Sequence, residues 1–217
     1  VMRLVFATNN AHKLSEVSGV LGSEYEIVTL REVGITEDIP ETGDTLDENA
    51  SLKARYVYER TGLNCFADDT GLEVEALGGA PGVRSARYAT DGHDFKANNR
   101  KLLAEMADKE NRNARFRTVI SLIIEGKEYQ VEGIVEGTIA TEESGAEGFG
   151  YDPLFMPKGH NKTFAEMTAE EKNLISHRGR AVRNLEQQLN NIEDEHRKIE
   201  EMECTPCMYG PPFPFDR

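Results

Sequence analysis

Two adjacent aspartates, Asp68 and Asp69, follow the apolar residues Cys65–Ala67. Such a run predicts a buried β-strand, and a turn after it would place both carboxylates at the sheet edge where open α/β folds bind ligands. Converging carboxylates can share a divalent cation, because two like charges in a partly dry cleft otherwise repel each other. The alternative from this stretch alone is a turn pair or a helix cap.

The segment ATNNAHK, residues 7–13, predicts an anion site at the start of a helix. Unpaired backbone N–H groups and the helix dipole attract anions there, and Lys13 adds a positive charge, so phosphate is the natural ligand. An ordinary asparagine cap with Lys13 in solvent explains the same residues equally well.

Two later segments add groups suited to a nucleotide. SGAEGFGYDPLF, residues 144–155, combines glycines that let the backbone approach a ligand with aromatic rings that can stack on a base. It predicts a base pocket or, alternatively, an aromatic-rich turn. EEKNLISHRGRA, residues 170–181, brings Lys172, His177 and Arg178 to another helix start, although alone it would indicate only surface charge.

The glycines around Pro81 do not form a phosphate-binding P-loop. Gly78, Gly79 and Gly82 are not followed by the Gly-Lys-Ser/Thr sequence that closes such a loop, so they predict a tight turn. Arg84 and Arg87 lie just after this turn, where they could bind an anion or form surface ion pairs.

The net charge excludes a protein that coats nucleic acid. The chain has 25 basic and 39 acidic residues, a net charge of −14, whereas nucleic-acid binding depends on lysines and arginines that neutralise phosphates. An acidic protein can still bind a polyanion if Lys13, Lys172 and Arg178 converge and a carboxylate-bound Mg²⁺ offsets the remaining charge. That combination suits a nucleoside triphosphate.

The elements that must position these residues alternate as in an α/β fold. Strands are predicted at 3–7, 25–30 and 65–67, and helices at 47–62 and 98–107. A further helix after the first strand is predicted from the apolar residues Leu14, Val17 and Leu21. Residues 116–124 and 128–137 predict a hairpin joined at Gly126 and Lys127, which makes the central sheet mixed. A last helix is predicted after Arg178 from the apolar residues Ala181, Leu185, Leu189 and Ile192.

These elements predict one domain over residues 1–192, followed by an acidic, proline-containing and poorly ordered extension over 193–217. No apolar segment approaches the roughly 20 residues that span a bilayer, and no secretory signal is recognisable, so we expect a cytoplasmic protein that does not bind membranes. Cys65, Cys204 and Cys207 do not form a disulfide framework. The last two have the spacing of half a zinc site, but no second half is found and the pair stays unassigned.

Five segments together resemble one family. ATNNAHK, ETGDTLDENASLKA, FADDTGLEVEALGGAPGVRSARY, GFGYDPLF and EKNLISHRGRA, in this order across residues 3–192, are similar to the inosine triphosphate pyrophosphatase (ITPase, or dITP/XTP pyrophosphatase) family. The resemblance implies an elongated mixed sheet flanked by helices, two lobes with a cleft between them, and a homodimer. It also implies Mg²⁺-dependent hydrolysis of ITP, dITP and XTP to the monophosphate and pyrophosphate, which cleanses the nucleotide pool.

The resemblance also implies roles for individual residues. Asp69 would be the proton acceptor, and the metal ligands would be Glu41, Asp68 and Asp69, with Pro40 standing where some relatives have a second acid. The substrate-binding residues would be Thr8, Asn9, Asn10, Ala11, His12, Lys13, Thr70, Phe149, Gly150, Tyr151, Asp152, Lys172, His177 and Arg178. Two alternative functions are a pyrophosphatase for modified pyrimidine nucleotides and a nucleotide sensor without turnover.

Overall fold

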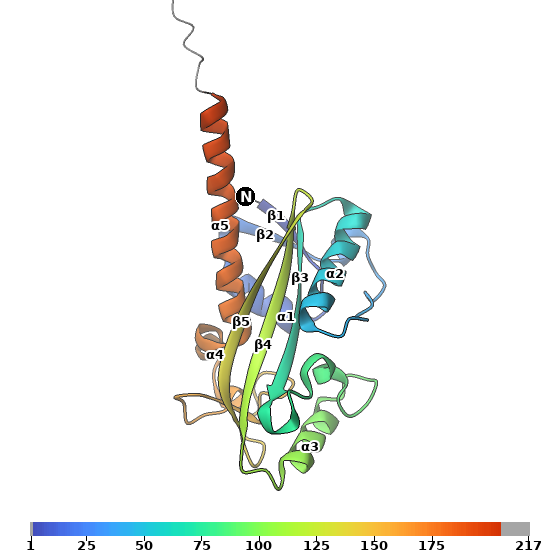
Figure 1. Ribbon diagram of the computed structural model, residues 1–217, viewed down its shortest axis with the longest axis vertical. Coiled ribbons are helices and arrows are strands. Elements are labelled where there is room, and N and C mark those ends of the chain that lie inside the picture. The colour runs from blue at the N-terminus through green and yellow to red at the C-terminus, as the bar shows by residue number, and fades with distance from the viewer. Residues whose placement is uncertain (1, 205–217) are drawn as a thin grey trace, which may run out of the picture.

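The computed structural model describes residues 2–204, and its centre is an elongated six-stranded sheet (Figure 1). The strand order is β2-β1-β3-β4-β5-β6, with β1 parallel to both β2 and β3 and the remaining pairs antiparallel. The predicted α/β fold with a mixed sheet is therefore confirmed. The strands are β1 Met2–Phe6, β2 Tyr25–Val28, β3 Cys65–Val74, β4 Asn113–Ile124, β5 Lys127–Ile139 and β6 Phe155–Pro157.

Helices cover both faces of the upper part of this sheet, as Figure 1 shows. The helices are α1 Ala11–Leu21, α2 Leu46–Thr61, α3 Phe95–Met106, α4 Ala169–Ile175 and α5 His177–Glu203. Neighbouring residues of a strand point to opposite faces of the sheet. Leu4 and Phe66 pack with α1 and α5 on one face, whereas Val5 and Cys65 pack with α2 on the other.

A separate hydrophobic cluster forms the lower lobe. It joins the far ends of β3 and β4 to α3 and to the loop after β5, through Leu72, Phe116, Leu102, Phe155 and Phe164 among others. The two lobes have different cores but share the long strands. Residues of both lobes therefore line the space where the lobes meet.

The aspartates lie within a strand and not at its end, which corrects one prediction. β3 was expected to stop at Ala67, but it continues to Val74 and pairs with β4 from Cys65↔Ile123 to Val74↔Ala114. The pairing of β1 with β3 ends at Phe66, so Asp68 and Asp69 lie just beyond the carboxyl end of β1. β3 continues because β4 pairs with one edge of it over its whole length, while groups such as Lys53 and Ser85 bond to the other edge.

The predicted hairpin is confirmed, with longer strands than expected, but its turn lies one residue earlier than predicted, because Lys127 already pairs with Ile124. Its two-residue turn is Glu125–Gly126, where φ is 49° and 83°. Positive φ at both turn positions matches the twist of the flanking strands, and Gly126 adopts it without steric cost.

The last helix begins earlier and ends later than predicted. Ser176 caps it, because its Oγ accepts the N–H of Gly179 at 3.0 Å, and α5 continues past Ile192 to Glu203. Residues 193–203, expected to be poorly ordered, are therefore helical. Cys204 is exposed, whereas Cys207 and the rest of 205–217 lie outside the described residues. Across residues 2–204, no helix combines the length and apolar character needed to cross a membrane.

Candidate active site

Lys13 reaches the sheet from the first turn of α1. Asn10 caps this helix, since its Oδ1 accepts the N–H groups of His12 at 2.9 Å and Lys13 at 3.3 Å. The ordinary cap expected as one alternative is thus present. The other half of that alternative is wrong, because the Lys13 side chain is only 16% exposed and its Nζ lies 3.1 Å from Asp68 Oδ1.

Asp68 lies between two cations. Its Oδ1 faces Lys13, and its Oδ2 lies 3.7 Å from Nε of Arg178 on α5. Burial alone would raise the pKa of this carboxyl, but Lys13, Arg178 and Lys53 outweigh it and lower the pKa to about 2. Asp68 is therefore charged at neutral pH and ties α1 and α5 to the centre of β3.

Asp69 has the opposite electrostatic environment. Its buried Oδ2 has no hydrogen-bond partner among the described residues. Burial raises the pKa of this carboxyl to about 6, although Lys53 lowers it and Asn49 contributes a hydrogen bond. Two neighbouring aspartates thus differ in protonation behaviour, and the one with the higher pKa keeps an oxygen available for another group.

Lys53 on α2 is a site residue that sequence reasoning missed. Its Nζ donates to Glu41 Oε1 at 2.8 Å and to the backbone carbonyl of Asp68. Burial would lower the pKa of Lys53, but Asp68 and Glu41 outweigh it, so the lysine stays charged. The available signal was the spacing of Asn49 and Lys53, which share the buried helix face of Ala50, Ala54 and Val57.

Glu16, also missed, connects the other two predicted cations. Lys172 Nζ lies 3.1 Å from Glu16 Oε1 and 2.7 Å from Asp152 Oδ2, and Arg178 forms an ion pair with Glu16. Burial would raise the pKa of Glu16, but Arg178 and Lys172 lower it. Its position three residues after Lys13 on α1 was the available signal, because residues i and i+3 share a helix face.

Aromatic and glycine residues form the lower wall. The rings of His12 and Phe149 stack with centroids 4.8 Å apart, and Tyr151 is held by a 2.6 Å hydrogen bond from its hydroxyl to Ser85 O. Gly148 has φ of 74°, and a Cβ there would lie 2.2 Å from Asp152 Oδ2. Only glycine therefore permits the turn that presents Phe149.

His177 lies above this wall as a neutral ring. It stacks on Phe116 with centroids 4.4 Å apart, and its Nδ1 has no hydrogen-bond partner in the described part of the chain. Burial, with the nearby Arg178 and Lys172, lowers its pKa well below the usual value. One ring nitrogen therefore donates and the other accepts at neutral pH.

One pocket of about 150 Å³ between the lobes collects most of the predicted residues. It is lined by Asn10, Lys13, Glu41, Asp69, Thr70, Phe149, Gly150, Tyr151, Asp152, Lys172, His177 and Arg178. Thr8, Asn9, Ala11, His12 and Asp68 do not line it. The structure thus brings together segments that are far apart in the sequence.

The donor groups of the pocket fit a divalent cation only in part. Across residues 2–204, no three His, Cys, Asp or Glu side chains are grouped as a metal site. Glu41 and Asp69 nevertheless line the same pocket, and the unpaired Oδ2 of Asp69 is a hard oxygen donor of the kind Mg²⁺ prefers. Asp68 as a further ligand stays a prediction, because its oxygens face Lys13 and Arg178.

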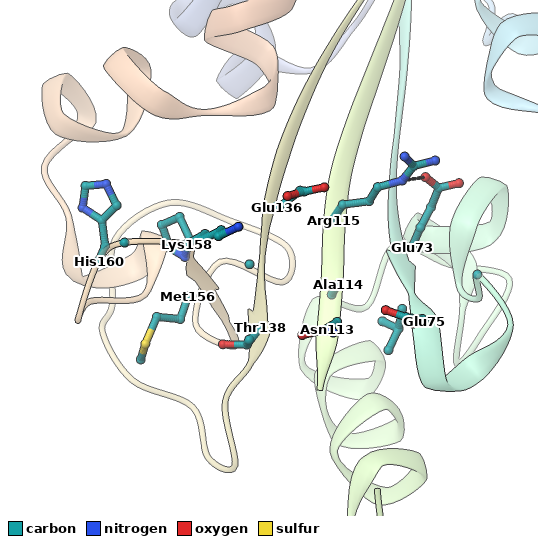
Figure 2. Close-up of a pocket in the computed structure, with 15 residues that line it drawn as sticks. Glu73, Glu75, Asn113, Ala114, Arg115, Glu136, Thr138, Met156, Lys158 and His160 are labelled. Atoms are coloured by element: carbon teal, nitrogen blue, oxygen red, sulfur yellow. Dashed lines mark hydrogen bonds and ion pairs between the residues drawn. The ribbon is translucent and has the colours of Figure 1, made fainter. Parts of the chain in front are cut away.

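A larger hollow of about 720 Å³ lies over the lower ends of β3 to β6 (Figure 2). Glu73 and Arg115 form an ion pair of 2.7 Å there, and Glu136 and Lys158 lie beside them. Its lining includes none of the predicted site residues. The smaller pocket, with its buried charges, is therefore the candidate active site.

Comparison with known proteins agrees with this fold. A dITP/XTP pyrophosphatase of Porphyromonas gingivalis is 57% identical over 84% of this chain and 95% of its own length. One of Bacillus subtilis is 47% identical over 83% of this chain and 93% of its own. The solved structure of the Staphylococcus aureus Ham1 protein superposes with a TM-score of 0.81 at 37% identity, covering 87% of this chain and 98% of that one.

These similarities extend over both lobes and not over one segment. The sequence profile of the Ham1 family matches residues 4–188, from β1 into α5. The resemblance found in the five sequence segments is therefore confirmed. This chain belongs to the Ham1 family.

Proposed function

We propose that the protein hydrolyses non-standard purine nucleoside triphosphates, namely ITP, dITP and XTP, to the monophosphate and pyrophosphate. The observation that carries the proposal is that one pocket holds the charged residues Lys13, Lys172 and Asp69 together with the aromatic ring of Phe149. Lysines suit a triphosphate, the aromatic ring suits a base, and a carboxylate with a free oxygen suits a water molecule. The names of the relatives point to the same reaction.

In the proposed reaction a water oxygen bonds to the α-phosphorus, and the bond from that phosphorus to the bridging oxygen of the β-phosphate breaks. Pyrophosphate leaves with the bonding electrons, and the water proton passes to Asp69. Without a bound ion, a pKa of about 6 leaves Asp69 mostly ionised at pH 7.5 and still basic enough to accept a proton. Lys13 and Lys172 would stabilise the charge that develops on the leaving group.

Mg²⁺ is part of the proposal, with Glu41 and Asp69 as its ligands. When bound, the ion would neutralise phosphate charge and polarise the bond that breaks. Lys53 donates to the Glu41 carboxylate and to the backbone carbonyl of Asp68, and so links Glu41 to the strand that carries Asp69.

Base selection is proposed to come from buried nitrogen atoms that lack hydrogen-bond partners within residues 2–204, although Nε of Arg178 faces Asp68 Oδ2 at 3.7 Å. Nε of Arg178 and Nδ1 of His177 have no hydrogen-bond partner in the described chain, and both residues line the pocket. An arginine N–H can donate to the 6-keto oxygen of hypoxanthine or xanthine. The 6-amino group of adenine is itself a donor, so in ATP it would face the arginine N–H without forming a hydrogen bond. Leaving buried polar groups unpaired costs free energy, and this cost discriminates strongly against ATP.

A substrate panel tests the function. ITP, XTP, GTP, ATP and a modified pyrimidine triphosphate are each incubated with the protein and Mg²⁺, and pyrophosphate is measured. We expect rapid release from ITP and XTP and little from ATP. Preferential release from the pyrimidine would favour the alternative pyrophosphatase, and binding without release would favour a sensor.

Two accompanying proposals do not depend on the pocket: the homodimer rests on the family resemblance, and the cytoplasmic location rests on the sequence. We propose a homodimer, which light scattering coupled to gel filtration would detect as twice the 24.2 kDa chain mass. We also propose a cytoplasmic location, and recovery of the protein in a membrane or secreted fraction would contradict it.

A further inference from the structure

Among the described residues, the ring of Phe149 makes aromatic contacts with two residues and cation contacts with two others. His12 stacks on it at 4.8 Å, Lys172 Nζ lies 4.9 Å and the Arg178 guanidinium carbon 5.5 Å from its centroid. The fourth is Phe95, whose ring centroid lies 6.2 Å away with a tilt of 46°. Phe95 is the apolar member of this set and lies at the pocket wall.

Phe95 is exposed although it is large and apolar. It is the first residue of α3 and is 36% exposed, so it is not a core residue of the lower lobe. Leaving an aromatic ring in water forgoes the stabilisation of burial. A ring at the mouth of a pocket regains it when a ligand with an apolar face covers it.

The backbone around Phe95 is held firmly against the loop of Phe149. Asp94 caps α3 by accepting the N–H of Ala97 at 3.0 Å, and Asn99 Nδ2 donates to Gly150 O at 3.1 Å. Because Gly150 follows Phe149 directly, this hydrogen bond joins α3 to the backbone of the Phe149 loop. The backbones that carry the two rings are therefore held next to each other, while the Phe95 side chain can still move.

We propose that Phe95 is a further substrate-binding residue that contacts the purine base and forms, with Phe149, an aromatic clamp. This inference rests on the proposed function. A planar base between two rings needs about 7 Å, twice the roughly 3.5 Å contact distance of carbon atoms. The rings are 6.2 Å apart and tilted by 46°, so the Phe95 side chain must move outward and rotate toward the plane of Phe149 to admit the base. This contact does not distinguish one purine base from another, because every base has a π face.

The test compares two ligands. Calorimetry measures the affinity for inosine monophosphate, and a competition assay measures the inhibition constant of inorganic tripolyphosphate. Phe95→Ala should weaken inosine monophosphate binding about 5- to 100-fold, the range typical of a lost base–aromatic stack. Tripolyphosphate has no base, so its inhibition constant should change less than twofold. Phe95→Tyr should retain wild-type affinity because the ring remains.

Leu63→Ala is the matched control, because Leu63 is similarly exposed at 44% and does not line the pocket. Leu63→Ala should leave the affinities for both ligands unchanged. Thermal unfolding should show that every variant is folded. Unchanged inosine monophosphate affinity in Phe95→Ala, or an equal loss for both ligands, would overturn the inference alone. A wild-type protein that neither binds inosine monophosphate nor cleaves ITP would overturn the proposed function, and the inference with it.

Discussion

Lys53→Met tests whether the buried charges around Asp69 stabilise the protein as a unit. Methionine is about as long as the lysine stem, so packing is largely kept while the ammonium is lost. The Lys53 side chain is 7% exposed and donates to Glu41 and to the Asp68 backbone. Its removal leaves the buried Asp68 and Asp69 with one fewer cation, a change that typically costs at least about 3 kcal/mol.

Arg55→Met on the same helix provides the comparison. Arg55 pairs with Glu128 at 2.7 Å, much as Lys53 pairs with Glu41 at 2.8 Å, but its side chain is 63% exposed. An exposed pair contributes about 0–1 kcal/mol, since water screens it. For a chain of this size, 3 kcal/mol corresponds to a decrease in Tm of about 6–12 °C.

Urea unfolding followed by circular dichroism at pH 7.5 in EDTA measures both variants. The pKa of Lys53 is raised in the folded protein, so its contribution is fully present below the ordinary lysine pKa and is lost only as pH rises through the folded value. The chosen pH therefore reports the whole effect. If Lys53→Met lowers the free energy of unfolding no more than Arg55→Met does, the argument from burial is refuted.

Three further predictions concern the strand that carries the aspartates and its surroundings. Asp69→Asn should keep the fold and lower ITP turnover by about two to four orders of magnitude, and a near-native rate would remove Asp69 from its role as proton acceptor. In metal-free protein, carboxyl NMR should show Asp68 titrating at a pH of about 2 and Asp69 at about 6, and equal values would contradict the assigned environments. Gly133→Ala should lower the Tm, because a Cβ at this position would lie 2.1 Å from the backbone oxygen of His177 in α5. Gly19→Ala within α1 should instead stabilise the protein by about 0.5–1 kcal/mol. A Tm change of the same sign in both variants would contradict the packing of α5.

The sequence predicted which segments meet better than it predicted how they meet. Lys13 could be paired with a carboxylate cluster because it lies at a helix start, where anions bind, whereas Lys172 lies in the last turn of α4, just before α5. The end of β3 was placed too early, because two aspartates resemble a turn when the partner strand is unknown. Leu72 and Val74 continue the alternating apolar pattern, but only β4, supplied from residues 113–124, makes a strand through Asp68 energetically acceptable.

The residues missed by sequence reasoning share one property, which is that their role depends on burial. Glu16 and Lys53 resemble solvent-exposed helix residues in the sequence, since most charged residues in helices are exposed. Each is instead paired with an oppositely charged group delivered from elsewhere in the chain, Glu16 with Arg178 and Lys53 with Glu41. Such pairing depends on the tertiary fold, so local spacing indicates it only weakly.

The most direct test of the central claim is product analysis by ³¹P NMR. ITP and ATP are incubated separately with the protein, with Mg²⁺ and with EDTA. We predict that ITP with Mg²⁺ gives inosine monophosphate and pyrophosphate in equal amounts, while ATP is largely unchanged. Inosine diphosphate with orthophosphate as the products, or equal rates for ITP and ATP, would contradict the account.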